Sequence, residues 1–190
     1  MRVKICGITQ PEDAKFAEQA GADAIGVVLF SSSPRSVSTE RAQEIFNSVG
    51  PFTTTVAVTH TQSKDDLEAI IALNPDAIQI SHPFAFDTKP KARVIRVVGK
   101  TVPLPDDCDA VIVDESHGGG KLFDLTRARD IVSRSTVPVI LAGGLSPRNV
   151  AEAIRQVRPY AVDVSSGVEK GPGIKDHSKI RAFIRTAKGA

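Results

Sequence analysis

Cysteine is scarce in this sequence: Cys6 and Cys108 are the only two among 190 residues, and there is no tryptophan. Two cysteines so far apart form neither a disulfide framework nor a close metal-binding pair. The histidines, which are His60, His82, His117 and His177, also lack the spacing of a metal site. We therefore predict a protein of the reducing cytoplasm that binds no metal.

An excess of one charge and long apolar runs are lacking as well. The 24 basic and 22 acidic residues leave a formal net charge of +2, which argues against a nucleic-acid-binding surface. No apolar stretch approaches the roughly 20 residues that a membrane-spanning helix needs. The opening MRVKICGITQPED predicts a strand followed by polar residues, not a signal peptide. We expect one globular domain over residues 1–190 that acts on a small molecule, without nucleic acid or a membrane.

Eight short runs of apolar and β-branched residues recur about every 22 residues. They span residues 2–6, 23–30, 53–58, 76–80, 92–98, 109–114, 137–142 and 160–165. Most are nearly continuous in apolar residues, which indicates parallel strands covered on both faces.

Helical spacing of apolar residues follows most of these runs. Polar residues that can cap a helix mark the expected starts, which are a Thr9–Glu12 capping box, Ser38, Ser63, Asp124, Ser146 followed by Pro147, and Asp176. Segments 81–91 and 99–108 can each hold at most a short helix. We predict an α/β fold, a single compact (β/α)8 TIM barrel whose helices after strands 4 and 5 are shortened or missing. The alternative is a doubly wound open sheet, which normally has fewer strands and a glycine-rich first turn.

The active site of such a barrel lies at the carboxyl ends of its strands. The polar residues there are Cys6, Ser31 to Arg35, Thr59, His60, Ser81, His82, Asp114, Gly143, Gly144 and Asp163 to Gly167. Strands 7 and 8 end in AGGLS and DVSSG, whose glycines and small hydroxyls predict a phosphate site formed by Gly143, Gly144, Ser165, Ser166 and Gly167. The alternative is that Gly144 only forms a tight turn.

Three further residues allow two interpretations each. A partly desolvated carboxylate at Asp114 could act as a general acid, or it could cap the glycine-rich turn that follows. Cys6 is either a small buried hydrophobe or a thiolate directed into the site. Arg35 is either a solvated surface residue or a partner for a carboxylate.

Several stretches together resemble the phosphoribosylanthranilate isomerase family. These are KICGIT, GADAIGVVLF followed by SPRSVS, DAIQISH, GGGKLFD, LAGGLSPRNV and RPYAVDVSSGVE. The resemblance runs nearly end to end, from Val3 through GPGIKDHSKIRAFI. Two positions depart from the family pattern: Thr59 replaces a phenylalanine, and Pro83 replaces the glycine after the strand-4 histidine.

The resemblance implies an enzyme of tryptophan biosynthesis that needs no metal or cofactor and works as a monomer or a homodimer. It implies an Amadori rearrangement of N-(5-phosphoribosyl)anthranilate with Cys6 as general base and Asp114 as general acid. By the same resemblance Arg35 meets the anthranilate, Asp163 lies near the sugar, and the segments around Gly144 and Ser165 to Gly167 hold the phosphate. His82, which ends a strand, is expected to line the pocket.

Two rival functions remain at this point. The histidine-pathway isomerase performs the same rearrangement but uses aspartate at the end of strand 1, where this chain has Cys6. A non-catalytic barrel that binds a phosphosugar would not need both an acid and a base at the strand ends.

Overall fold

Eight parallel strands close into a barrel in the order of the sequence. The computed structural model describes residues 1–86, 88–98, 104–105, 107–114 and 125–190. The strands are β1 (Arg2–Ile5), β2 (Ala24–Leu29), β3 (Thr54–Thr59), β4 (Ala77–Ile80), β5 (Arg93–Val98), β6 (Ala110–Val113), β7 (Val139–Leu141) and β8 (Ala161–Val164). All eight predicted strands are confirmed, and the pairing of β1 with β8 excludes the open sheet.

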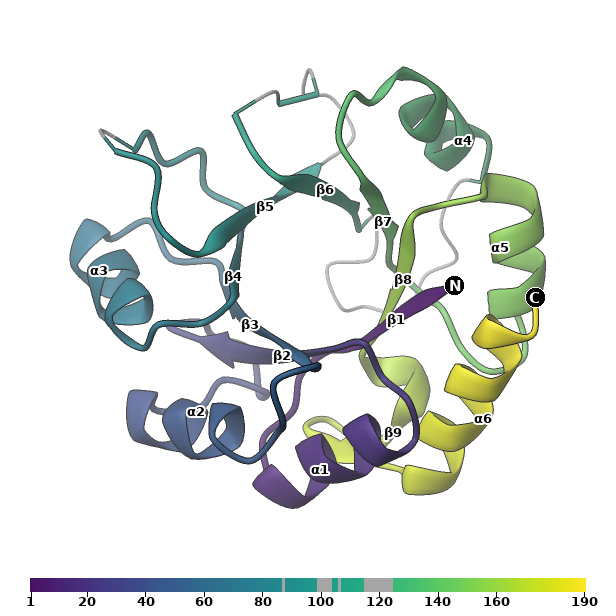
Figure 1. The fold of residues 1–190 in the computed structure, drawn as a ribbon, viewed down its shortest axis with the longest axis horizontal. Coiled ribbons are helices and arrows are strands. Elements are labelled where there is room, and N and C mark those ends of the chain that lie inside the picture. Colours follow the sequence, from purple (N-terminus) through teal and green to yellow (C-terminus); the bar gives the residue numbers. More distant parts are fainter. Residues whose placement is uncertain (87, 99–103, 106, 115–124) are drawn as a thin grey trace.

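Helices surround most of this barrel (Figure 1). They are α1 (Pro11–Gln19), α2 (Thr39–Phe46), α3 (Lys64–Ala72), α4 (Leu125–Arg134), α5 (Val150–Val157) and α6 (His177–Lys188). In the described part of the chain no helix follows β4 or β5, as predicted, and Figure 1 shows loops on that side of the ring. None of the described helices is long and apolar enough to cross a membrane.

Side chains alternate between two cores because successive strand residues point to opposite faces. Val3 and Ile5 of β1 pack outward in the core beneath the helices. Cys6 belongs instead to the core inside the barrel, which includes Val28, Val56, Ile112 and Ile140 from other strands. Lys4 has the same inward parity and pairs in register with Asp163 of β8.

Arg96 of β5 is buried on the outer face, on the side of the barrel that lacks helices. Its Nη2 donates to the carbonyl oxygen of Phe84 at 2.7 Å, and its Nε and Nη2 form two bonds to the carboxylate of Asp107 at 3.0 and 2.6 Å. The guanidinium thus ties together the loops after β4 and β5, where the other strands have a helix.

Three of the predicted helix caps are confirmed. The side chains of Ser38, Ser63 and Asp176 each accept a hydrogen bond from a backbone N–H in the first turn of α2, α3 and α6. The predicted Asp124 cap and the GGGKLFD loop lie outside the described residues.

The capping box at Thr9 was a wrong prediction. Helix α1 follows Gln10, without a side-chain cap. The hydroxyl of Thr9 donates instead to the carbonyl oxygen of Gly173 at 2.7 Å, so a contact distant in sequence displaces the local one.

The predicted start of α5 at Ser146 and Pro147 is also wrong. The helix begins at Val150. Asn149 holds the preceding residues in a turn, because its Oδ1 accepts from Ser146 N at 2.7 Å and its Nδ2 donates to the Gly144 carbonyl at 2.9 Å.

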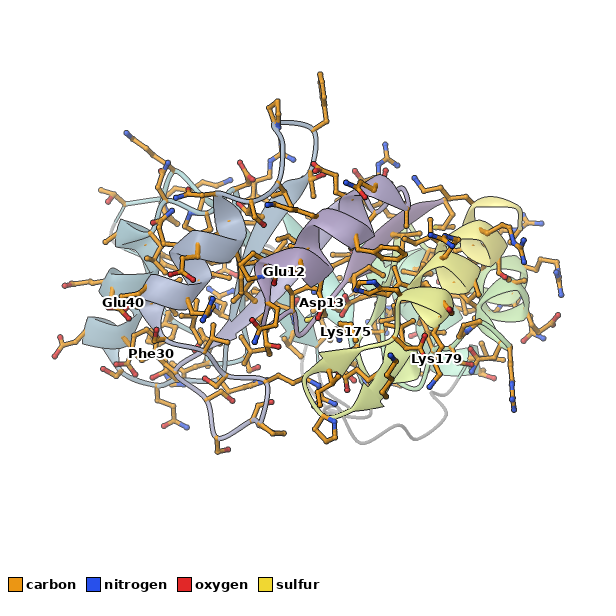
Figure 2. All side chains as sticks on the ribbon, turned by 90° about the horizontal axis from the view of Figure 1, so that it is seen from below. Glu12, Asp13, Phe30, Glu40, Lys175 and Lys179 are labelled. Carbon is orange, nitrogen blue, oxygen red and sulfur yellow. The ribbon has the colours of Figure 1, made fainter. Side chains whose placement is uncertain are left out.

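A small hairpin that the sequence did not indicate lies between β8 and α6. It consists of a short 3-10 turn, η1 (Ser166–Val168), and two strands, β9 (Glu169–Gly171) and β10 (Ile174–Lys175). In the side view of Figure 2, Lys175 of this hairpin and Phe30, which follows β2, lie at the same end of the barrel. That end is the carboxyl end of the strands.

Candidate active site

Most of the predicted site residues meet at the carboxyl end of β6, β7 and β8. One small hollow there is lined by Asp114, Gly143, Gly144, Asp163, Ser165 and Ser166, together with Ala142, Leu145 and Val164. These residues come from three strand ends that are far apart in sequence. The hollow therefore brings a predicted acid, a predicted sugar contact and most of the predicted phosphate loop together.

The shape of this hollow depends on its glycines. Gly143 and Gly144 have φ of +92° and +64°, a region that residues with a Cβ rarely adopt. At Gly167 a Cβ would lie 1.9 Å from the carbonyl oxygen of Leu145. The loops after β7 and β8 thus approach each other so closely that only glycine fits between them.

Cys6 lies beside this hollow, at the end of β1. Its N–H donates to the carbonyl oxygen of Val164 on β8 at 2.8 Å, and the residue is 7% exposed. Burial raises the pKa of the Cys6 thiol, while the ammonium groups of Lys4 and Lys175 oppose that rise. The thiol is thus buried, yet two cations favour its ionised form.

Asp163 is a buried carboxylate with a buried partner. Its Oδ1 accepts from Lys4 Nζ at 3.0 Å, and the same ammonium donates to Gln79 Oε1 at 3.0 Å. Burial raises the pKa of Asp163 and the nearby charge of Asp114 raises it further, against the opposing effect of Lys4. Asp114 is therefore close enough to act on the charge of Asp163.

Lys4 and Gln79 were missed by the sequence reasoning. Gln79 is the one polar residue of β4, and Lys4 lies between the apolar Val3 and Ile5 of β1; such a residue is usually directed to solvent. The signal that could have found them is strand parity, because Lys4 shares its face with Cys6, and Gln79 shares its face with Ser81.

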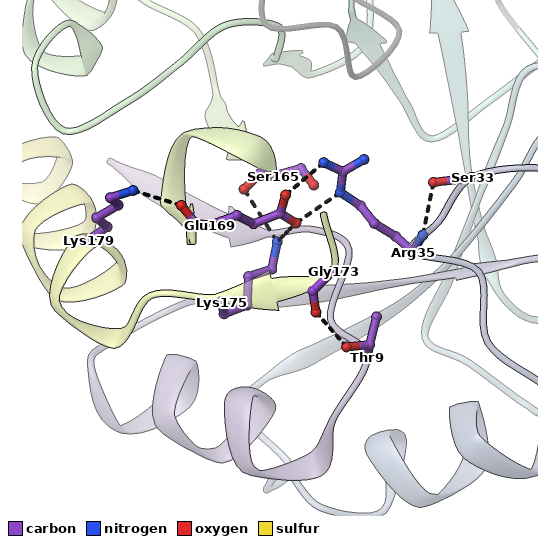
Figure 3. A network of polar contacts seen from close by, with 8 residues as sticks. All are labelled: Thr9, Ser33, Arg35, Ser165, Glu169, Gly173, Lys175 and Lys179. Carbon is purple, nitrogen blue, oxygen red and sulfur yellow. Dashed lines mark hydrogen bonds and ion pairs between the residues drawn. The ribbon is translucent and has the colours of Figure 1, made fainter. Parts of the chain in front are cut away.

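Arg35 is held by a buried ion-pair cluster, shown in Figure 3. Its Nε and Nη2 donate to the two carboxylate oxygens of Glu169 at 2.9 and 2.7 Å. Lys175 Nζ donates to Glu169 Oε1 at 2.8 Å and to the Ser165 carbonyl at 3.3 Å. The side chain of Lys175 is fully buried and that of Arg35 is 14% exposed. Arg35 is therefore a fixed guanidinium at the site, not a solvated surface residue.

Gly7 allows the Arg35 side chain to pass over the end of β1. A Cβ at Gly7, which has φ of +71°, would lie 2.6 Å from Arg35 Cδ and 2.8 Å from Ser165 Oγ. The Ser165 hydroxyl is buried and has no hydrogen-bond partner among the described residues. Arg35, Ser165 and the residue after Cys6 are thus in one contact group.

His82 does not join this group. Its ring packs edge-on against Phe84, with 4.6 Å between centroids, and its carbonyl oxygen accepts from Arg96 Nη1 at 3.4 Å. A different histidine reaches across the strand ends, since His60 Nδ1 and Ser81 Oγ are 2.8 Å apart.

Two wider hollows lie at the opposite end of the barrel. They are lined by residues at the amino ends of β3, β4 and β5, which include Pro51, Thr53, Asn74 and Asp76. None of the predicted acid, base or phosphate-binding residues lines them, so the small hollow at the carboxyl end remains the candidate site. Among the described residues no cluster of His, Cys, Asp and Glu could hold a metal ion.

The comparisons with known proteins agree on one family. The model of the N-(5'-phosphoribosyl)anthranilate (PRA) isomerase family matches residues 3–186. An N-(5'-phosphoribosyl)anthranilate isomerase from Methanoregula boonei is 63% identical, over the whole of this chain and 98% of its own length.

Solved structures of the same family superimpose on the barrel. A phosphoribosyl anthranilate isomerase in complex with reduced 1-(o-carboxyphenylamino)-1-deoxyribulose 5-phosphate is 34% identical with a TM-score of 0.82. A monomer generated from the dimeric enzyme of Thermotoga maritima is 32% identical with a TM-score of 0.83. Both alignments cover the full length of both chains.

The carboxyl-end site, the closed barrel and these full-length similarities lead to one conclusion. The chain belongs to the N-(5'-phosphoribosyl)anthranilate isomerase family of tryptophan biosynthesis.

Proposed function

We propose that Cys6 is the general base and Asp114 the general acid with which this chain converts N-(5-phosphoribosyl)anthranilate to 1-(2-carboxyphenylamino)-1-deoxyribulose 5-phosphate. The observation that carries the proposal is their placement around Asp163. Asp114 lines the same hollow as Asp163, and the charge of Asp163 acts on Cys6. Asp114 lines the hollow and Cys6 lies beside it, so that an acid and a base approach one region from separate strands.

The chemistry needs both groups. Asp114 protonates the ring oxygen of the furanose, and the ring opens to a protonated Schiff base. That cation acidifies the hydrogen on C2 of the sugar, which the Cys6 thiolate removes. The resulting enolamine takes up a proton at C1 and loses the proton of its C2 hydroxyl, which gives the ketone. Each positioned acid or base contributes roughly 100-fold or more to such a rate.

The phosphate is assigned to the loops after β7 and β8. Gly143, Gly144, Ser165, Ser166 and Gly167 supply backbone N–H groups and hydroxyls, and the close packing at Gly167 supports a preformed cradle. A phosphate bound by these loops, away from the reacting C2, would orient the sugar between the acid and the base. Substituting Ser166 by Asp should weaken the competition of inorganic phosphate with substrate, because two anions would then face each other.

The anthranilate carboxylate is assigned to Arg35, and the sugar hydroxyls to Asp163. The bonds to Glu169 use Nε and Nη2 of Arg35, which leaves Nη1 for a substrate carboxylate. His82 remains a predicted pocket residue. An Arg35→Gln variant should raise KM for the substrate more than it lowers kcat.

The oligomeric state is proposed to be a monomer or a homodimer. Phe52, which lies next to the wider hollows at the amino end, is 98% exposed, and an exposed aromatic of that kind would suit a contact between copies. Light scattering across a concentration series decides between the two states. We also expect the enzyme to act in the cytoplasm, where Cys6 stays reduced.

The test is turnover of freshly generated substrate, followed by the loss of anthranilate fluorescence. Cys6→Ser and Asp114→Asn should each lower kcat by roughly 100-fold or more. Cys108→Ser is the matched control, because it removes the other cysteine far from the site, and should leave kcat unchanged. Activity that survives Cys6→Ser would move the base elsewhere, with Asp163 as the next candidate. A folded wild-type chain that binds phosphate but shows no turnover would contradict the proposal.

A further inference from the structure

The barrel interior next to the proposed base contains a buried lysine that the mechanism leaves unused. Lys4 lies two residues before Cys6 on β1 and is 4% exposed. Its Nζ donates to Gln79 Oε1 and to Asp163 Oδ1, each at 3.0 Å. An ammonium has three N–H donors, and these two bonds use two of them. The positive charge of Lys4 favours the ionised form of the Cys6 sulfur.

Gly26 of β2 makes the approach of ammonium and sulfur possible. A Cβ at Gly26 would lie 2.9 Å from Cys6 Sγ and 3.2 Å from Lys4 Nζ. Both atoms therefore border the space that a side chain at position 26 would fill. This accounts for a glycine inside a strand, where glycine otherwise weakens the sheet.

The charges around Cys6 come from several elements. Those that act on Cys6 are the cations Lys4 on β1, Arg35 after β2 and Lys175 on β10, and the carboxylate Asp163 on β8. Asp114 after β6 acts in turn on Asp163, and Glu169 on β9 pairs with Arg35 and Lys175. Without Asp114, three cations face two carboxylates and leave one positive charge in excess. A thiolate at Cys6 neutralises that excess charge.

We propose that Lys4 is a positioning residue for the isomerase reaction, whose ammonium, fixed by Gln79 and Asp163, stabilises the thiolate form of Cys6 beside Gly26. The proposal rests on the role of Cys6 as base given above. Lys4 keeps its own proton throughout, because the charges of Asp163 and Cys6 outweigh the effect of burial and raise the pKa of Lys4. The thiolate takes the proton from C2 of the sugar and becomes the thiol.

The test is the titration of Cys6, measured by the ultraviolet absorbance of its thiolate in a Cys108→Ser background. Lys4→Met should raise the pKa of the thiol by a unit or more, which means about tenfold less thiolate at neutral pH. Asp163→Asn should shift the titration in the opposite direction, because it removes a negative charge and leaves Lys4 with fewer competing partners. Lys64→Met, an exposed lysine in α3, should change nothing.

Lys4→Met leaves the carboxylate of Asp163 buried and unpaired, so this variant can fail to fold. The double variant Lys4→Met/Asp163→Asn removes both charges and covers that case. The pKa of the Cys6 thiol should be higher in the double variant than in Asp163→Asn alone, by about as much as Lys4→Met raises it above the wild-type value. In each variant that retains turnover, the rising limb of kcat/KM against pH should move with the thiol titration.

The two proposals fail in different ways. A thiol titration that is unchanged in Lys4→Met, or in the double variant relative to Asp163→Asn, overturns the role of Lys4 and leaves Cys6 as base. Turnover that survives Cys6→Ser overturns the base assignment and with it the role of Lys4 in the reaction.

Discussion

Removing the charge of Glu169 is expected to destabilise the fold, because this one carboxylate pairs with the buried Lys175 and with Arg35, whose side chain is 14% exposed. The side chain of Glu169 is 4% exposed, and it accepts from Arg35 at 2.9 and 2.7 Å and from Lys175 at 2.8 Å. In Glu169→Gln the amide keeps one acceptor oxygen, but its NH2 group faces N–H donors. The side chain of Lys175 is fully buried, so water cannot solvate its ammonium once the negative charge is lost.

The magnitude follows from the burial of the partners. Removing one member of a buried ion pair typically costs about 3–5 kcal/mol, since the other charge stays desolvated. We therefore expect Glu169→Gln to lower the free energy of unfolding by about 3–5 kcal/mol. Glu152→Gln is the matched control: Glu152 pairs with Arg155 on the surface of α5, with side chains 53% and 60% exposed. That change should cost far less, because water and salt screen an exposed ion pair.

Urea denaturation, monitored by circular dichroism, measures the free energy of unfolding of both variants. The sequence has no tryptophan, which makes fluorescence a less useful probe. The slope of the unfolding free energy against urea should stay constant, so that midpoints report stability. Equal losses in Glu169→Gln and Glu152→Gln would refute the reasoning, because burial would then have made no difference. Lys175→Met combined with Glu169→Gln should recover part of the loss.

Three further predictions follow from single contacts. Gly167→Ala should weaken inhibition by inorganic phosphate and lower Tm, because its Cβ would lie 1.9 Å from the Leu145 carbonyl oxygen. Arg96→Leu should lower the free energy of unfolding by about 1–3 kcal/mol, measured in urea, because the Phe84 carbonyl loses its donor. Burial acts to raise the pKa of Glu169, but Arg35 and Lys175 hold it below its ordinary value of 4.5. The stability that Glu169 contributes is therefore present above that value and is lost as the pH falls through the lowered pKa.

Each of these three predictions has a control variant or an outcome that would contradict it. Gly171→Ala is the control for Gly167→Ala, because a Cβ at Gly171 meets nothing within 4 Å, and the two variants must differ. Arg93→Leu, at an exposed position of the same strand, must cost less than Arg96→Leu. The stability difference between wild type and Glu169→Gln must shrink in acid; a difference that grows would mean that the pKa of Glu169 is not lowered in the folded state.

The barrel itself could be predicted from the sequence because each strand is a local apolar run and the strands pair in sequence order. The candidate site could be predicted to the extent that its members end strands. Asp114, Gly143, Gly144, Asp163, Ser165 and Ser166 do so, and they meet in one hollow.

What the sequence did not indicate depends on contacts between distant segments. The hydroxyl of Thr9 is taken by Gly173, so the expected capping box does not form. Glu169 and Lys175 have no local pattern that marks them as partners of Arg35, because the hairpin that carries them is too short for a periodic signal. Lys4 was overlooked because a charged residue in a strand is usually solvated, and only the register with Asp163 reveals its burial.

Arg96 lies where other strands are followed by a helix, and this should affect how easily that side of the barrel opens locally. The outer face of β5 gives one residue, Val94, to the large core under the helices and one position to Arg96, whereas β1, β2 and β8 give two or three residues each. Amide hydrogens exchange through local opening, which is least costly where few apolar contacts must break. Backbone amides of β5 should therefore exchange with deuterated solvent before those of β1 and β8, and the barrel should loosen first on the side opposite Cys6.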